Sequence, residues 1–175
     1  MNKNNLKILF FIIILFPTIS YSKEVYLSPN ENSYEQIQEA LILLEPGDTL
    51  SLSEGFYSFE DGLSLDVDNV VIEGAGKDKT ILSFKNQVTG AQGLLVTSSG
   101  VILKNFAIED SKGDALKVIG ADGIYMINLR TEWTGGPKST NGAYGLYPVE
   151  SRDVLIDGCV AIGASDAGIY VGQSE

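Results

Sequence analysis

Hydrophobic and polar residues alternate along most of the chain, and the alternation recurs in five similar units. The units open at residues 62, 93, 115, 145 and 168, so successive units start 22 to 31 residues apart. Within a unit, apolar residues at every second position indicate short β-strands, because neighbouring side chains of a strand point to opposite faces. A repeat of little more than twenty residues with occasional insertions is typical of a solenoid.

Stacked units of this kind bury one continuous core that no single unit can bury alone. The apolar positions of the strands are therefore expected to point inward and to be buried. These positions are Leu94, Val96, Val101, Leu103, Leu116, Val118, Ile124, Met126, Leu146, Val154 and Ile156. A further register, just after the second strand of each unit, holds Gly74, Asn105, Asn128 and Gly158. Because Gly and Asn tolerate positive φ, this register predicts a repeated tight turn.

The fold predicted by the repeat is all-β, a right-handed parallel β-helix with an N-terminal capping helix. We assign residues 23–61 to the cap and residues 62–175 to the coils. The cap helix is expected near residues 33–44, where Ile37, Leu41 and Leu44 have helical spacing before Pro46 and Gly47. The last unit stops in mid-coil without a second cap, so we expect the chain to be an N-terminal fragment of a longer solenoid.

The N-terminus has the pattern of a secretory signal peptide. Lys3 and Lys7 precede an apolar run over residues 8–16, and small residues follow at 20–22. The run is short for a membrane-spanning helix, which needs about 20 apolar residues. We therefore assign residues 1–22 to the signal and predict a secreted or periplasmic protein without membrane contact after cleavage. A retained N-terminal anchor is the alternative.

The net charge of the chain excludes some classes of binding partner. The formal net charge is −11, and it becomes −13 once Lys3 and Lys7 are removed with the signal. Nucleic acids and anionic membranes are bound through clustered Lys and Arg, so neither is expected as a partner. Attraction to polyuronate chains would require local basic residues or a cation. The single Cys159 cannot form an internal disulfide, and its register indicates a small core residue.

One stretch of the cap and one of the first coil carry a family resemblance. Residues 46–57 (PGDTLSLSEGFY) and 70–76 (VVIEGAG) resemble the N-terminal entry of secreted right-handed parallel β-helix proteins, the pectate-lyase-like superfamily. This superfamily includes polysaccharide lyases, hydrolases, epimerases and repeat proteins without established activity. The resemblance implies the fold more strongly than any chemistry, because one fold hosts many functions.

Residues 144–150 (YGLYPVE) are similar in spacing to the Tyr-Gly-x-Asp-Pro-His-Asp motif of mannuronan C5-epimerases. Tyr144, Gly145 and Pro148 match that motif, whereas Val149 stands at its His and Glu150 at its second Asp. The chain contains no His, so a general base that titrates near neutrality is missing. The resemblance therefore implies at most a carboxylate role for Glu150.

The strand alternation also predicts a binding face. Tyr147 and Tyr170 are expected to point outward from neighbouring coils, and the insertion over residues 130–144 is expected to overhang them with Trp133 exposed. Aromatic rings beside carboxylates suit sugars, and the candidate substrate-binding residues are Trp133, Tyr144, Tyr147, Glu150, Asp166 and Tyr170. The alternative is that the tyrosines are ordinary exposed aromatics and the insertion is a surface loop.

We expect no cofactor and no metal, although calcium held by Asp166, Glu150 and a further coil stays open because hard cations collect carboxylates. The functional hypothesis is a secreted β-helix repeat protein that contacts polysaccharide. Residues 1–175 do not by themselves demonstrate catalysis. The alternative is a polysaccharide lyase, epimerase or hydrolase whose catalytic residues lie partly beyond residue 175. The catalytic residues, the glycan, the oligomeric state and the presence of enzymatic activity are not determined by the sequence.

Overall fold

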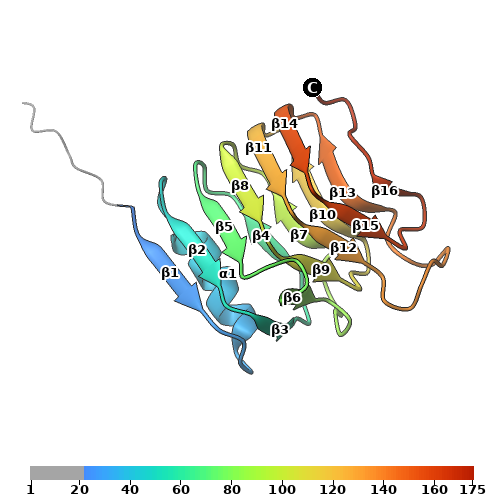
Figure 1. Ribbon diagram of the computed structural model, residues 1–175, viewed down its shortest axis with the longest axis horizontal. Helices are drawn as coiled ribbons and strands as arrows, with labels where there is room; N and C mark the ends of the chain where they lie inside the picture. The colour runs from blue at the N-terminus through green and yellow to red at the C-terminus, as the bar shows by residue number, and fades with distance from the viewer. Residues whose placement is uncertain (1–21) are drawn as a thin grey trace, which may run out of the picture.

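The computed structural model describes residues 22–175 as a stack of coils built from sixteen strands and one helix (Figure 1). Every strand pair is parallel, and the strands form three sheets, which we call sheets A, B and C. Sheet A contains β1 (Glu24–Leu27), β2 (Thr49–Leu52), β5 (Val71–Gly74), β8 (Val101–Lys104), β11 (Asp122–Ile127) and β14 (Arg152–Asp157). Sheet B contains β3 (Gly55–Ser58), β6 (Thr80–Ser83), β9 (Ala107–Glu109), β12 (Arg130–Glu132) and β15 (Val160–Ile162). Sheet C contains β4 (Leu63–Leu65), β7 (Gln92–Val96), β10 (Asp114–Ile119), β13 (Tyr144–Val149) and β16 (Ala167–Ile169).

Each coil adds one strand to sheet C, then one to sheet A, then one to sheet B. Strands β7, β8 and β9 form one such coil, and β10, β11 and β12 form the next. The repeat aligns as the sequence predicts, since Leu94 pairs with Leu116, and Leu116 with Leu146. The all-β parallel β-helix expected from the sequence is therefore confirmed.

The predicted core is confirmed for nine of its eleven positions. Leu94, Val96, Val101, Leu103, Leu116, Val118, Ile124, Met126 and Leu146 are at most 2% exposed. The remaining two, Val154 and Ile156, are partly buried and pack against the core from β14, the last strand of sheet A. A register slip of one residue would have turned all of these side chains outward, so the register is right and only coverage is incomplete at β14.

The turn register is confirmed at three positions and wrong at Gly74. Asn105, Asn128 and Gly158 have φ of 62°, 51° and 63°, whereas Gly74 has no positive φ. Gly74 is required for a different reason: a Cβ there would lie 2.4 Å from the carbonyl oxygen of Asn105 in the next coil. Close approach of two backbones, and not the turn conformation, therefore accounts for this glycine.

Asn128→Ala is expected to lower the free energy of unfolding by about 1–2 kcal/mol, because alanine is strained at positive φ and loses an amide hydrogen bond. In the folded protein the Asn128 Nδ2 donates to Asn105 Oδ1 at 2.8 Å. Asn128→Gly loses the bond but keeps the backbone conformation, so its loss should be smaller. Urea unfolding of the two variants measures both effects, and equal stabilities would contradict the argument from φ.

The cap is a helix that lies over one end of the stack. Helix α1 (Ser33–Leu43) is close to the predicted 33–44, and Ile37, Leu41 and Leu44 are buried as its spacing predicts. It packs against β1, β3 and β4. Strand β1, which pairs with β2, was not expected from the sequence. The helix thus covers the inward side chains at the open end of the first coil.

The predicted signal peptide over residues 1–22 lies outside the described residues except for its last position. Within residues 22–175, no helix is long and apolar enough to cross a bilayer.

Candidate functional site

Three tyrosine side chains stack against one another on the outer face of sheet C. Tyr144 and Tyr147 belong to β13, and Tyr170 directly follows β16. The ring centroids lie 4.5 Å apart for Tyr144 and Tyr147, 5.0 Å for Tyr144 and Tyr170, and 5.4 Å for Tyr147 and Tyr170. These separations are typical of favourable aromatic pairs. We call these three residues the tyrosine cluster.

The parallel register explains why these rings meet. Leu146 pairs with Ile169, so Tyr147 and Tyr170, one residue further along, occupy adjacent positions on the opposite, outward face. Tyr170 remains 44% exposed. Gly172 lies beneath the rings, because a Cβ there would be 3.1 Å from Tyr147 and 3.2 Å from Tyr170. The outward orientation that the sequence predicts for the two tyrosines is thus confirmed.

Lys117 adds a positive charge to the same face. It pairs with Tyr147 across β10 and β13, and its Nζ lies 5.1 Å from the centroid of the Tyr147 ring. This is the geometry of a cation–π contact. The sequence analysis did not identify Lys117, although the alignment of the repeats places it opposite Tyr147.

Two carboxylates border the tyrosine cluster. The Tyr144 N–H donates to Asp114 Oδ1 at 3.2 Å, and burial raises the pKa of the Asp114 carboxyl. Partial burial raises the pKa of Tyr144, and a hydrogen bond with Asp166 raises it further. The Tyr144 hydroxyl therefore stays protonated near neutrality. The face combines aromatic surfaces with hydrogen-bond donors and acceptors.

The expected position of Trp133 is wrong. Its side chain is only 5% exposed, and its Nε1 donates to the carbonyl of Ser111 at 2.7 Å. Trp133 continues the alternation of β12, in which Thr131 points inward, so it turns into the core instead of overhanging sheet C. The rest of the insertion projects as the long loop between β12 and β13 (Figure 1).

Glu150 also lies apart from the tyrosine cluster. It follows the C-terminal end of β13 with φ of 52° and lines a separate depression with Ser151, Arg152 and residues 173–175. The six candidate substrate-binding residues therefore do not all line one depression. The structure brings together Tyr144, Tyr147, Tyr170 and Asp166, and it leaves Glu150 at the neighbouring turn because the chain reverses there between sheets C and A.

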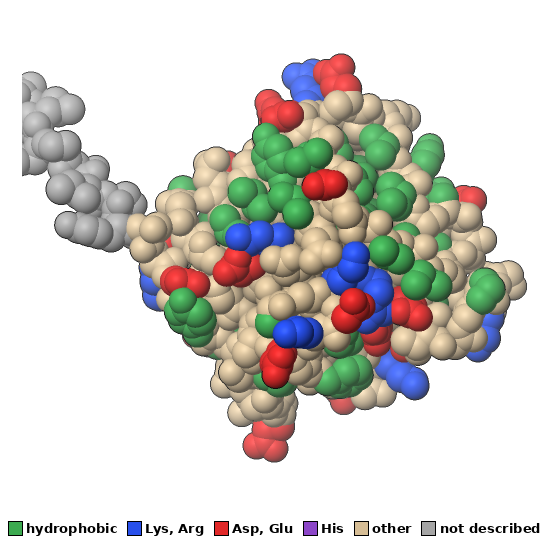
Figure 2. Space-filling model, viewed as in Figure 1, with side chains coloured by type: hydrophobic (Ala, Val, Ile, Leu, Met, Phe, Trp, Pro, Cys, Tyr) green, Lys and Arg blue, Asp and Glu red, His purple; other side chains and the backbone are tan. Residues whose placement is uncertain are grey.

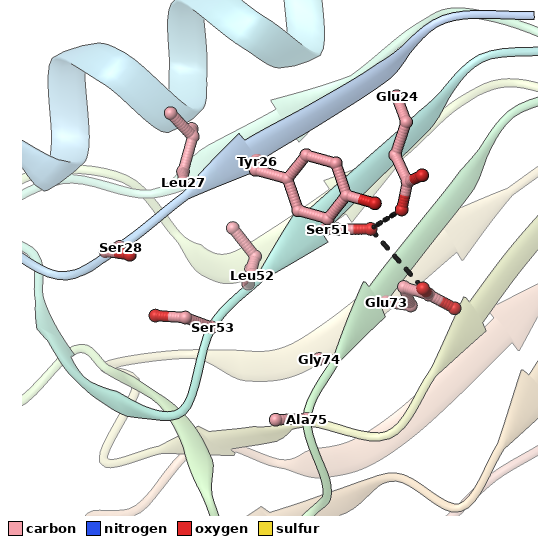
Figure 3. Close-up of a pocket in the computed structure, with 10 residues that line it drawn as sticks. All are labelled: Glu24, Tyr26, Leu27, Ser28, Ser51, Leu52, Ser53, Glu73, Gly74 and Ala75. Atoms are coloured by element: carbon pink, nitrogen blue, oxygen red, sulfur yellow. Dashed lines mark hydrogen bonds between the residues drawn. The ribbon is translucent and has the colours of Figure 1, made fainter.

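A second pocket lies on the outer face of sheet A near the cap (Figure 3). The Ser51 Oγ is 2.8 Å from a Glu24 carboxylate oxygen and 3.3 Å from one of Glu73. Hydrogen bonds from Tyr26 and Ser51 lower the pKa of Glu24, and the Lys104 Nζ lies 2.6 Å from Glu73. Since its partners favour the ionised carboxylate, Glu24 is not suited to donate a proton at neutral pH.

The next features are the possible metal-binding groups and the Cys159 thiol within residues 22–175. No group of three or more His, Cys, Asp or Glu side chains in this range is arranged to hold a metal ion. Cys159 packs against the core, and burial raises the pKa of its thiol, which keeps it in the unreactive protonated form. Cys159 was expected to be a small core residue, and it is half-buried.

Comparison with known proteins gives a match to a solved structure. No protein-family model matches the sequence, and no curated protein matches it either. A similar solved structure is the alginate lyase from Paenibacillus sp. str. FPU-7, with a TM-score of 0.53 and 16% sequence identity. The match covers 75% of this chain and 44% of the lyase, so the chain spans less than half the length of that protein. At this identity the match shows the shared fold of parallel sheets.

Proposed function

We propose that this protein contacts polysaccharide through the tyrosine cluster on sheet C. The observation that carries the proposal is the stack of three tyrosine rings with Lys117, Asp114 and Asp166 at its border. The C–H faces of a sugar ring pack on aromatic surfaces, and its hydroxyls bond to carboxylates and tyrosine hydroxyls.

Two further facts support the proposal. The fold is shared with a protein that acts on a polysaccharide, as its name states, although the low identity carries no residue roles across. The sequence also predicts a secretory signal at residues 1–22, which would bring the protein to the compartment where polysaccharides of envelopes and matrices occur.

Tyr147→Ala is expected to weaken binding of a glycan oligosaccharide by about 1–2 kcal/mol, the usual cost of removing an aromatic anchor. Tyr147 contacts both other rings of the cluster and also Lys117. Calorimetric titration across neutral and acidic oligosaccharides measures the change.

Tyr125→Ala is the matched control, because Tyr125 is a partly buried outward tyrosine of β11 on sheet A that donates to Asp153 at 2.7 Å. It should leave glycan binding unchanged. If both variants bind every tested glycan as the wild type does, the tyrosine cluster is surface packing and the proposal fails.

The second candidate function is a polysaccharide lyase, epimerase or hydrolase. It is favoured by Tyr144, whose hydroxyl is protonated at neutral pH and bonds to Asp166, and whose backbone N–H donates to Asp114. Incubation with polyuronates separates the two functions, since a lyase would form an unsaturated product detectable by ultraviolet absorbance, a hydrolase would form new reducing ends, and an epimerase would invert C5, which NMR detects. Product from the wild type that is lost in Tyr144→Phe would establish catalysis, whereas binding without any product supports contact alone.

A further inference from the structure

Three lysines gather in a pocket at the turns between sheets B and C. Lys85 follows β6, Lys112 follows β9 and Lys138 follows β12, so one lysine comes from each of three successive coils. The pocket has a volume of about 520 Å³, within the range of small-ligand sites, and Trp133 and Asn141 also line it. We call it the lysine pocket.

These lysines are not neutralised by their surroundings. Most Lys and Arg side chains on the face seen in Figure 2 lie beside Asp or Glu. Within residues 22–175, none of the ion pairs involves Lys85, Lys112 or Lys138. Lys112 Nζ donates only to the carbonyl of Val88, at 3.3 Å. The pocket is thus a local positive region on a protein whose formal net charge is −11.

One acid lines the pocket, and its carboxylate is already engaged. Asp110 accepts the Thr134 N–H at 2.7 Å on one oxygen and the Thr134 hydroxyl at 2.6 Å on the other. Asp110 therefore holds the loop after β12 against the turn after β9. Its charge offsets one of the three lysines and leaves an excess of positive charge.

The walls of the pocket are fixed by buried and bridging groups. The hydrogen bond from Trp133 to Ser111 ties two coils together, and the Asn141 amide donates to the carbonyls of Gly136 and Gly163 at 3.0 and 2.6 Å. A pocket whose walls are already ordered loses little entropy when a ligand enters.

Two short segments of chain connect the lysine pocket to the tyrosine cluster. Asn141 precedes Tyr144 by three residues, and Ser111 precedes Asp114 by three. Three residues of chain span at most about 11 Å, so the edge of the pocket lies within the length of a short sugar chain from the rings. A ligand on the tyrosine cluster can therefore extend into the pocket.

We propose that the lysine pocket is an anion-binding subsite that takes the acidic group, a carboxylate or a sulfate ester, of a glycan held on the tyrosine cluster. The inference rests on the proposed function and adds the substrate class, an acidic polysaccharide. It also explains how a protein with a strong net negative charge binds an anionic chain, because the local field at the pocket opposes the overall one.

The test combines Lys85→Gln, Lys112→Gln and Lys138→Gln in one variant. All three side chains are exposed, so the fold should be retained, which circular dichroism verifies. We expect binding of uronic-acid and sulfated oligosaccharides to weaken about tenfold, and binding of a neutral oligosaccharide of equal length to stay unchanged. The matched control is Lys23→Gln, Lys77→Gln and Lys79→Gln, which changes the net charge equally but lies away from the pocket.

Three results would overturn the subsite. In the first, the pocket variant binds acidic glycans as tightly as the wild type does. In the second, the control variant loses as much affinity for acidic glycans as the pocket variant, which would mean that only the overall charge matters. Inorganic sulfate titrated alone could bind as tightly as the acidic oligosaccharide, which would assign the pocket to a free ion. If the lysine variant binds acidic glycans normally but Tyr147→Ala still weakens glycan binding, the subsite proposal fails and the proposed function stands. If the wild-type protein binds no glycan at all, both proposals fail.

Discussion

Trp133→Ala is expected to lower the free energy of unfolding by about 3–5 kcal/mol, as truncation of a buried tryptophan does. The side chain is 5% exposed and belongs to the continuous core. The substitution leaves a cavity between two coils and also leaves the Ser111 carbonyl without the 2.7 Å bond from the indole Nε1. Denaturant unfolding followed by circular dichroism measures the loss.

Trp133→Phe is the control for this prediction, since it retains most of the buried area and loses only the hydrogen bond. It should cost clearly less than Trp133→Ala. A loss below about 1 kcal/mol for Trp133→Ala would match an exposed loop residue and would contradict the buried position. In that case the original interpretation, an exposed aromatic anchor for sugar, would regain support.

Gly142→Ala is expected to destabilise the protein by about 2–3 kcal/mol, at the upper end of the range for overpacking. A Cβ at Gly142 would lie 1.8 Å from the Gly113 carbonyl oxygen and 2.8 Å from the Trp133 ring. The first clash is with backbone of the coil below, which cannot rotate away as a side chain would. The stacked turns must therefore separate to admit one methyl group.

Gly120→Ala separates this clash from the general cost of replacing glycine. Gly120 has φ of 68°, but no atom lies within 4 Å of a Cβ placed there. Its substitution should cost only the backbone strain, about 1–2 kcal/mol. Thermal or urea unfolding ranks the two variants, and a Gly142→Ala loss no larger than that of Gly120→Ala would show that the turns have room to adjust.

The candidate site could be predicted only where it lies on strands. Tyr147 and Tyr170 were expected to point outward in adjacent coils, and their rings do stack, because strand alternation determines which face a residue occupies. Lys117 follows from the same register and could have been found in the same way. Asp114 opens β10 just after a turn, where an Asp side chain commonly bonds to nearby backbone, and only the structure shows it accepting the N–H of Tyr144.

The sequence by itself determined the stacked parallel sheets, the inward register and the cap helix. These features depend on local periodicity, and in a solenoid each unit repeats the contacts of the one before it. The core positions Leu94, Leu116 and Leu146 therefore align in space as they align in sequence.

Only the tertiary structure decided where the turns between sheets place their side chains. It left Glu150 in a separate depression and brought Lys85, Lys112 and Lys138 together from three coils. Turn residues follow no fixed period, so their directions depend on contacts with neighbouring coils, 20 or more residues away along the chain. The close approach of Gly142 to Gly113 is a contact of this kind, since it exists only once the coils are stacked.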